Sequence, residues 1–153
     1  MNLPKQKEAK NLVTFIENNE TFKATQKTYD AWIKMKKSAL NDGINLILVS
    51  AFRSIERQQE LVEEKRKKDI SENEIFSVLA RPGYSEHHTG RALDLHSPGS
   101  ALLEEDFENT EAFLWLQHNG NKYGFYMSYP RDNDFNIVYE PWHWCFHEKI
   151  SLP

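Results

Sequence analysis

Cysteine is almost absent from this chain, which has a single one, Cys145, among its 153 residues. One cysteine excludes an internal disulfide, so no disulfide framework indicates a secreted protein. Long hydrophobic runs are also missing, because no stretch approaches the ~18 apolar residues of a membrane span. The first residues contain no apolar segment of the roughly 7–15 residues that a signal peptide needs. We therefore expect a cytoplasmic protein that has no membrane partner.

An excess of positive charge is lacking as well. The formal net charge is -4 at pH 7, and the one short basic run, residues 65–68, follows a glutamate-rich stretch of an expected helix. Proteins that bind nucleic acid need a dense basic surface that neutralises phosphates, so we expect no nucleic acid as a partner. Apolar residues make up 39% and charged residues 27%, which is ordinary for a globular protein. The length fits one domain over residues 1–153 with its own core.

Apolar spacing and turn residues predict the order of the secondary-structure elements. Helices are expected over residues 5–19, 25–41, 55–68, 72–80 and 110–119. Strands are expected over residues 45–50, 92–95, 123–127, 137–139 and 142–146. Because helices come first and strands follow, we predict an α+β fold. In this fold a small antiparallel sheet carries the functional site, flanked by the N-terminal and connecting helices.

Two histidines and an aspartate lie within one ten-residue stretch, residues 85–94. Gly90 lets the chain bend back between His87 and Asp94, and a strand beginning at Ala92 would place Ala92 and Asp94 on one face. An aspartate in an apolar strand is costly to bury without a partner. A metal ion is one such partner, and backbone amides are the alternative that spacing alone leaves open. Histidine nitrogen and carboxylate oxygen are ligands that catalytic zinc accepts.

A second group of polar residues, Glu140 and His143, lies among aromatic side chains in residues 139–144. Charged groups in such surroundings often have displaced pKa values. A catalytic zinc site has three protein ligands and a water, and an adjacent carboxylate can take the proton of that water. His143 can therefore be the third ligand and Glu140 the general base. The alternative for Glu140 is a surface turn before a proline.

These residues fall into the pattern Ser85-x-His87-x-x-Gly90-x-Ala92-x-Asp94, followed by Glu140-Pro-Trp-His143. The pattern resembles the VanY-type D-alanyl-D-alanine carboxypeptidases, zinc peptidases related to D-Ala-D-Ala dipeptidases and some phage endolysins. Residues 50–58, which read Ser-Ala-Phe-Arg-Ser-Ile-Glu-Arg-Gln, also resemble a family segment. So do residues 82–87, 123–125 and 129–130, and the matching motifs stand in the family's order between residues 46 and 147.

The resemblance implies one zinc ion per chain, bound by His87, Asp94 and His143. It implies that Glu140 acts as the catalytic base and then as the acid. Zinc would polarise the scissile carbonyl and lower the pKa of its bound water toward ~7.

The resemblance also implies roles in substrate recognition. Arg53 would stabilise the oxyanion or hold the substrate, because a guanidinium is permanently charged. Gln58, Ser85 and Trp142 would help to grip the C-terminal residue of the substrate.

Several positions depart from the usual family pattern. His88 stands where the family often has glutamine, and we expect it at the pocket rim or behind the ligands, not on the metal. His96 is expected behind the site or at the surface, and Cys145 is not expected to bind metal. Ser128 stands where related sequences often have a basic residue, which affects substrate preference more than catalysis.

The sequence therefore predicts a zinc carboxypeptidase that removes C-terminal D-alanine from peptidoglycan stem peptides. We favour L,D-cleavage of a tetrapeptide over D,D-cleavage of a pentapeptide, because recycled stems in the cytoplasm mostly end as tetrapeptides. One alternative is a phage-type endolysin peptidase, against which the acidic balance and the lack of a basic wall-binding appendage argue. Another is a non-catalytic module that binds wall peptides, against which Glu140 argues because a structural site needs no base.

Overall fold

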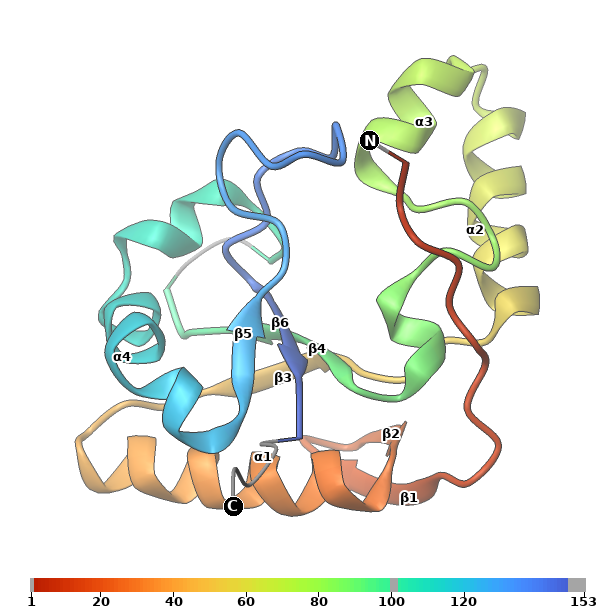
Figure 1. Ribbon diagram of the computed structural model, residues 1–153. Helices are drawn as coiled ribbons and strands as arrows, with labels where there is room; N and C mark the ends of the chain where they lie inside the picture. Colours follow the sequence, from red (N-terminus) through yellow and green to blue (C-terminus); the bar gives the residue numbers. More distant parts are fainter. Residues whose placement is uncertain (1, 100–101, 149–153) are drawn as a thin grey trace, which may run out of the picture.

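A four-stranded antiparallel sheet lies at the centre of the computed structural model, which describes residues 2–99 and 102–148 (Figure 1). Its strands are β3 (Ile47–Ser50), β4 (Ala92–His96), β5 (Phe125–Met127) and β6 (His143–Phe146). They lie in the order β3-β4-β6-β5, with every neighbouring pair antiparallel. The predicted α+β fold with a small antiparallel sheet is confirmed.

Within the described residues, four α-helices lie around the sheet: α1 (Gln26–Asn41), α2 (Ile55–Lys67), α3 (Glu72–Val78) and α4 (Glu111–Asn119). Each begins after a serine or threonine whose hydroxyl accepts a backbone N–H from the first turn, as helix N-caps do. The four helices predicted after residue 20 are confirmed, with ends shifted by one or two residues. None of the helices that the structure describes is long and apolar enough to cross a membrane.

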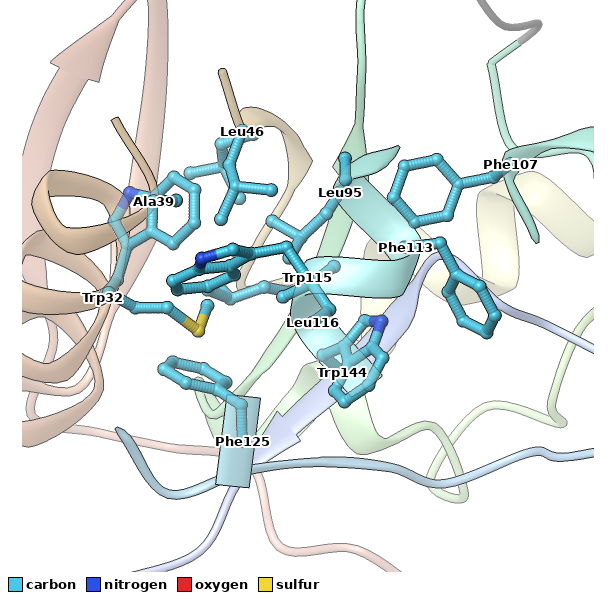
Figure 2. Close-up of a cluster of buried hydrophobic side chains, with 14 of the residues drawn as sticks. Trp32, Ala39, Leu46, Leu95, Phe107, Phe113, Trp115, Leu116, Phe125 and Trp144 are labelled. Carbon is cyan, nitrogen blue, oxygen red and sulfur yellow. The ribbon is translucent and has the colours of Figure 1, made fainter. Parts of the chain in front are cut away.

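The two faces of the sheet differ because side chains alternate along each strand. Leu93 and Leu95 of β4 face one side with Trp144 of β6, and they pack against α1 and α4. Figure 2 shows this cluster, to which α1 contributes Trp32 and α4 contributes Leu116. The residues between them along the strands point to the opposite face. Alternation therefore separates the hydrophobic core from the polar residues of the site.

The predicted helix over residues 5–19 is wrong. Residues 13–24 form a two-stranded hairpin of β1 (Val13–Glu17) and β2 (Glu20–Ala24). Asn18 and Asn19 connect the strands with φ values of 50° and 65°, a left-handed conformation that asparagine tolerates in two-residue hairpin turns. The β-branched and aromatic residues before this turn favour a strand over a helix.

The segment before the hairpin runs beside the short 3₁₀ helix η1 (Glu86–Thr89). The N–H groups of Gln6 and Ala9 donate to the carbonyls of Gly83 and His88, each at 2.8 Å. A carboxylate oxygen of Glu8 accepts the backbone N–H of Ile55 at 2.7 Å, at the start of α2. This N-terminal segment therefore holds both the residues around η1 and the first turn of α2.

The predicted strand over residues 137–139 is also wrong. The backbone of this segment does not bond to a neighbouring strand. The N–H of Val138 donates instead to the carbonyl of Ser77 at the end of α3. The side chain of Asn133 donates to the carbonyl of Ile137 at 2.8 Å and closes a loop. Residues 137–139 have no regular secondary structure, and they pair with no strand among the described residues.

Gly90 is the point where η1 meets the N-terminal segment, and replacing it by alanine is expected to lower stability. Its φ is 71°, and an added Cβ would lie 2.7 Å from Cδ2 of Leu12. A strained left-handed alanine with a clash costs about 1–3 kcal/mol, seen as a lower thermal midpoint. Gly43→Ala is the control, because Gly43 has a φ of 78° and a Cβ added there would meet nothing within 4 Å. An equal loss in both variants would contradict the close packing at Gly90.

Candidate active site

Three side chains that could hold a metal ion meet on the face of the sheet opposite the core. His87 comes from η1, Asp94 from β4 and His143 from β6. All three are buried, and one ligand atom from each lies within 4.8 Å of the others. His87 Nε2 is 3.1 Å from Asp94 Oδ2, and His143 Nδ1 is 3.2 Å from Asp94 Oδ1. The structure thus brings together the three predicted ligands, which the sequence separates by up to 56 positions.

In the rings of His87 and His143, one nitrogen lies beside Asp94 and is called the inner nitrogen below. The other, outer nitrogen faces an oxygen of another residue. His87 Nδ1 is 2.7 Å from the carbonyl of Ala51, and His143 Nε2 is 2.8 Å from Oε1 of Glu86. A neutral imidazole that donates its outer N–H presents a lone pair on its inner nitrogen. Both inner nitrogens and the carboxylate of Asp94 therefore converge as donors, and a His-Asp-His set of this kind fits zinc.

Buried charge around His143 also favours a cation. Burial opposes charge on this ring, but the bonds with Asp94 and Glu86 outweigh it and raise the pKa of His143 to about 10. Burial likewise opposes ionisation of Glu86, yet the bonds from His143 and Ser128 lower its pKa to about 2. A metal ion between Asp94 and His143 would take the place of the proton on Nδ1.

Arg53 follows β3 and is held by two side chains. Its Nη1 donates to Oε1 of Gln58 at 3.0 Å, and its Nη2 donates to the hydroxyl of Ser50 at 3.3 Å. Gln58 in turn donates to the carbonyl of Ala80 at 2.8 Å. Burial lowers the pKa of Arg53 from its usual value while Asp94 opposes the shift, and a guanidinium remains charged near neutral pH. The structure therefore fixes a permanent cation beside the ligand group.

Glu140 lies in the loop before β6. Its N–H donates to the carbonyl of Tyr129 at 3.0 Å, and its own carbonyl accepts the N–H of His143 at 3.3 Å. Its Oε1 lies 3.8 Å from Nδ1 of His143. Burial raises the pKa of Glu140 to about 7, against the attraction of His143 and with the help of Asp94. A carboxyl group with such a pKa is suited to accept and return a proton near neutral pH.

All the predicted site residues line one cavity of about 440 Å³. They are Arg53, Gln58, Ser85, His87, Asp94, Glu140, Trp142 and His143. Two further residues of this cavity that contact His143 were not predicted as site residues. The Tyr129 ring lies 4.9 Å from that of His143, and Glu86 bonds to the same histidine. Glu86 stands between two motif residues, Ser85 and His87, but nothing in the sequence indicates which histidine it would contact.

The remaining polar residues near the site lie outside the ligand group. His88 is fully buried, so the part of our expectation that placed it at the pocket rim is wrong. Its Nδ1 donates to the carbonyl of Arg53 at 2.7 Å, and its Nε2 accepts the N–H of Gly83 at 3.1 Å. It therefore ties the Arg53 backbone to the turn before Ser85.

His96 and Cys145 are likewise not part of the His87–Asp94–His143 group. His96 is the last residue of β4, opposite Ile47 of β3. Burial raises the pKa of Cys145 to about 12, which keeps its sulfur as a thiol near neutral pH. Neither residue contributes a ligand atom to the group that the structure brings together.

Comparison with known proteins identifies a family whose match includes these site residues. Residues 21–149 match the VanY D-alanyl-D-alanine carboxypeptidases. The chain belongs to this family. The family predicted from the sequence motifs is confirmed, and the match covers every residue of the predicted site.

Individual relatives are consistent with this membership. The chain is 36% identical over 120 residues to the putative carboxypeptidase YodJ of Bacillus subtilis (strain 168), covering 74% of this chain and 42% of that protein. The chain thus spans less than half the length of this curated relative.

Solved structures of carboxypeptidases share the fold. The LdcB LD-carboxypeptidase superposes with a TM-score of 0.80 and 32% identity, over 94% of this chain and 71% of that chain. A variant of the vancomycin-resistance D,D-pentapeptidase VanY, in complex with Zn(II), superposes with a TM-score of 0.72 and 25% identity. This match covers 95% of this chain and 86% of that chain.

Proposed function

We propose that this chain is a zinc-dependent carboxypeptidase that removes C-terminal D-alanine from peptidoglycan stem peptides, with residues 1–153 as a single catalytic domain. The observation that carries the proposal is the buried group of His87, Asp94 and His143, which faces the same cavity as Glu140 and Arg53. Membership of the VanY family and the Zn(II) complex of a VanY structure support zinc as the metal.

Within this proposal, the three ligands hold zinc, and Glu140 moves the protons. When bound, zinc supplies a Lewis acid for the scissile carbonyl and makes its water more acidic. Glu140 accepts the proton of the attacking water and returns it to the leaving amine of D-alanine. Its pKa of about 7 suits both steps, because the carboxyl can exist in either form near neutral pH.

The other polar side chains that line the cavity are suited to bind the substrate. We infer that Arg53 binds either the developing oxyanion or the substrate's carboxylate, with Gln58 holding the guanidinium in place. Ser85 and Trp142 line the same cavity and remain predicted contacts of the terminal residue. The apolar wall, which includes Leu79 and Val138, suits the methyl group of alanine.

Arg53→Ala is expected to lower kcat/KM by about 10²–10³, the usual effect of losing one donor to an oxyanion. A loss in kcat would indicate oxyanion stabilisation, whereas a rise in KM alone would indicate binding of the substrate's carboxylate. Steady-state kinetics on a defined stem peptide separates the two. Arg57→Ala is the matched control, because Arg57 is exposed on α2 and pairs with Glu60. Similar kinetics for both variants would contradict a role for Arg53.

We further propose L,D-cleavage of tetrapeptide stems, because the LdcB LD-carboxypeptidase is 32% identical to this chain with a TM-score of 0.80. Recycled muropeptides, which mostly carry tetrapeptides, are the substrate source that this preference favours. Mass spectrometry of defined tetrapeptide and pentapeptide stems tests it. Loss of D-alanine from the pentapeptide alone would contradict the L,D preference.

The same reactions test the class of protein. A carboxypeptidase releases free D-alanine, and an endolysin-type peptidase would instead release internal stem fragments. A module that only binds wall peptides would retain the stem without turnover. Activity that survives complete zinc removal by a chelator would contradict the metal assignment.

A further inference from the structure

We propose that Glu86 is a positioning residue for the metal centre, which holds His143 in the tautomer and orientation that present Nδ1 to the metal. Ser128 holds Glu86 in turn. The inference rests on the proposed function, because it takes zinc as the occupant of the site. It adds to the three proposed ligands a side chain that contacts a ligand rather than the metal.

The contacts that carry the inference meet on the outer edge of the His143 ring. Nε2 of His143 lies 2.8 Å from Oε1 of Glu86, and the hydroxyl of Ser128 donates to the same oxygen at 2.5 Å. On the inner edge, Nδ1 lies 3.2 Å from Oδ1 of Asp94. The side chains of His143 and Glu86 are only 4% and 17% exposed, so water competes little for the Nε2 proton.

The proton balance of the ring follows from these contacts. An ionised carboxylate only accepts hydrogen bonds, so Glu86 requires a proton on Nε2. A neutral imidazole has a single N–H, which leaves the Nδ1 lone pair free for a cation beside Asp94. The Tyr129 ring packs at 4.9 Å from that of His143 and limits rotation of the ring out of this position.

The two histidine ligands differ in their outer partners. His87 faces a neutral carbonyl, that of Ala51, whereas His143 faces a carboxylate. A carboxylate that accepts the N–H of the outer nitrogen makes the inner nitrogen a stronger electron donor. Glu86 therefore tunes one ligand of the site, in addition to orienting it.

The fold explains how Glu86 reaches His143. Ser85 caps η1 by accepting the N–H of His87, so Glu86 and His87 are consecutive residues of one short turn. His87 points at Asp94 while Glu86 points at His143, and Ser128 reaches Glu86 from the end of β5. One turn thus supplies both a ligand and the partner of another ligand.

The test measures zinc affinity without substrate, by competition with a chromophoric chelator. Glu86→Ala is expected to bind zinc about 10- to 100-fold more weakly, as for other outer partners of metal ligands. Glu86→Gln keeps an oxygen acceptor but loses the charge, so its loss should be smaller. Glu108→Ala is the control, because Glu108 pairs with Arg131 away from the cavity.

A second readout follows the histidine proton itself. In the zinc-loaded wild type, two-dimensional ¹H–¹⁵N spectra of the imidazole should show His143 with a slowly exchanging proton on Nε2. In Glu86→Ala this proton should exchange rapidly with water. Ser128→Ala leaves the carboxylate in place and should accelerate this exchange to a smaller degree.

The outcomes separate the two proposals. Wild-type affinity in Glu86→Ala, within about twofold, would overturn the role of Glu86. If that variant does not fold, unchanged affinity and proton exchange in both Glu86→Gln and Ser128→Ala would overturn it. Failure of the wild type to bind zinc would instead contradict the proposed function.

Discussion

Glu140→Gln is expected to lower kcat by about 10²–10⁴ while zinc stays bound, because the amide cannot accept the proton that general-base catalysis requires. The substitution keeps the shape of the side chain, and the backbone bonds of Glu140 to Tyr129 and His143 do not depend on it. Release of D-alanine from a defined stem measures the rate, and elemental analysis measures bound zinc.

The control for this variant is Glu60→Gln, which changes an exposed carboxylate of α2 in the same way. It should keep wild-type kcat. Turnover in Glu140→Gln within about tenfold of wild type would remove Glu140 from the mechanism, since that difference corresponds to only about 1.4 kcal/mol of barrier.

Asp94→Asn is expected to abolish activity through loss of the metal. The Asp94 carboxylate lies between both histidines, with one oxygen toward each. The asparagine of the variant puts a neutral amide in place of this anionic donor at the centre of the group. Zinc affinity should fall by more than the roughly 10- to 100-fold effect that is typical for an outer partner of a ligand. Competition with a chelator measures this loss directly.

Asp106→Asn provides a matched control outside the cavity. Circular dichroism should show that Asp94→Asn keeps its secondary structure, so that lost affinity reports the site itself. Zinc binding by Asp94→Asn at wild-type strength would show that the metal, if bound, lies elsewhere.

The sequence singled out residues that the structure gathers around one cavity, whereas it did not predict the N-terminal hairpin. The proposed ligands and base lie in two short segments whose residue types and spacing carry their own chemistry. Alternation in β4 places Asp94 opposite the core face of Leu93 and Leu95, as a strand pattern requires. These signals are local, which is why they could be read without coordinates.

The two errors in secondary structure have different causes, one local and one distant in sequence. Leu12, Phe15 and Ile16 have helical spacing, and the hairpin depends instead on the left-handed turn at Asn18 and Asn19. Val138 bonds to Ser77 rather than to a neighbouring strand. The hairpin thus follows from local turn and strand signals that the helical spacing concealed. The Val138 bond is a tertiary contact that no local pattern indicates.

The contact between Glu86 and His143 is another long-range feature, since 57 positions separate the two residues. No periodicity or motif spacing indicates which side chain faces the outer nitrogen of a ligand. Glu86 could be seen in the sequence as a carboxylate next to His87. Its contact with His143 depends on how the fold places β6 relative to η1.

The register of the sheet has a consequence for the lifetime of the folded chain. Asp94 pairs with Ser50 of β3 and with His143 of β6, so the ligand group forms only after these distant strands have paired. An unfolded chain offers no comparable site, and bound zinc would therefore stabilise the folded state by mass action. Amide protons of β4 and β6 would then exchange with solvent more slowly as zinc is added. Zinc supply would thus influence how long the protein survives proteolysis, in addition to whether it is active.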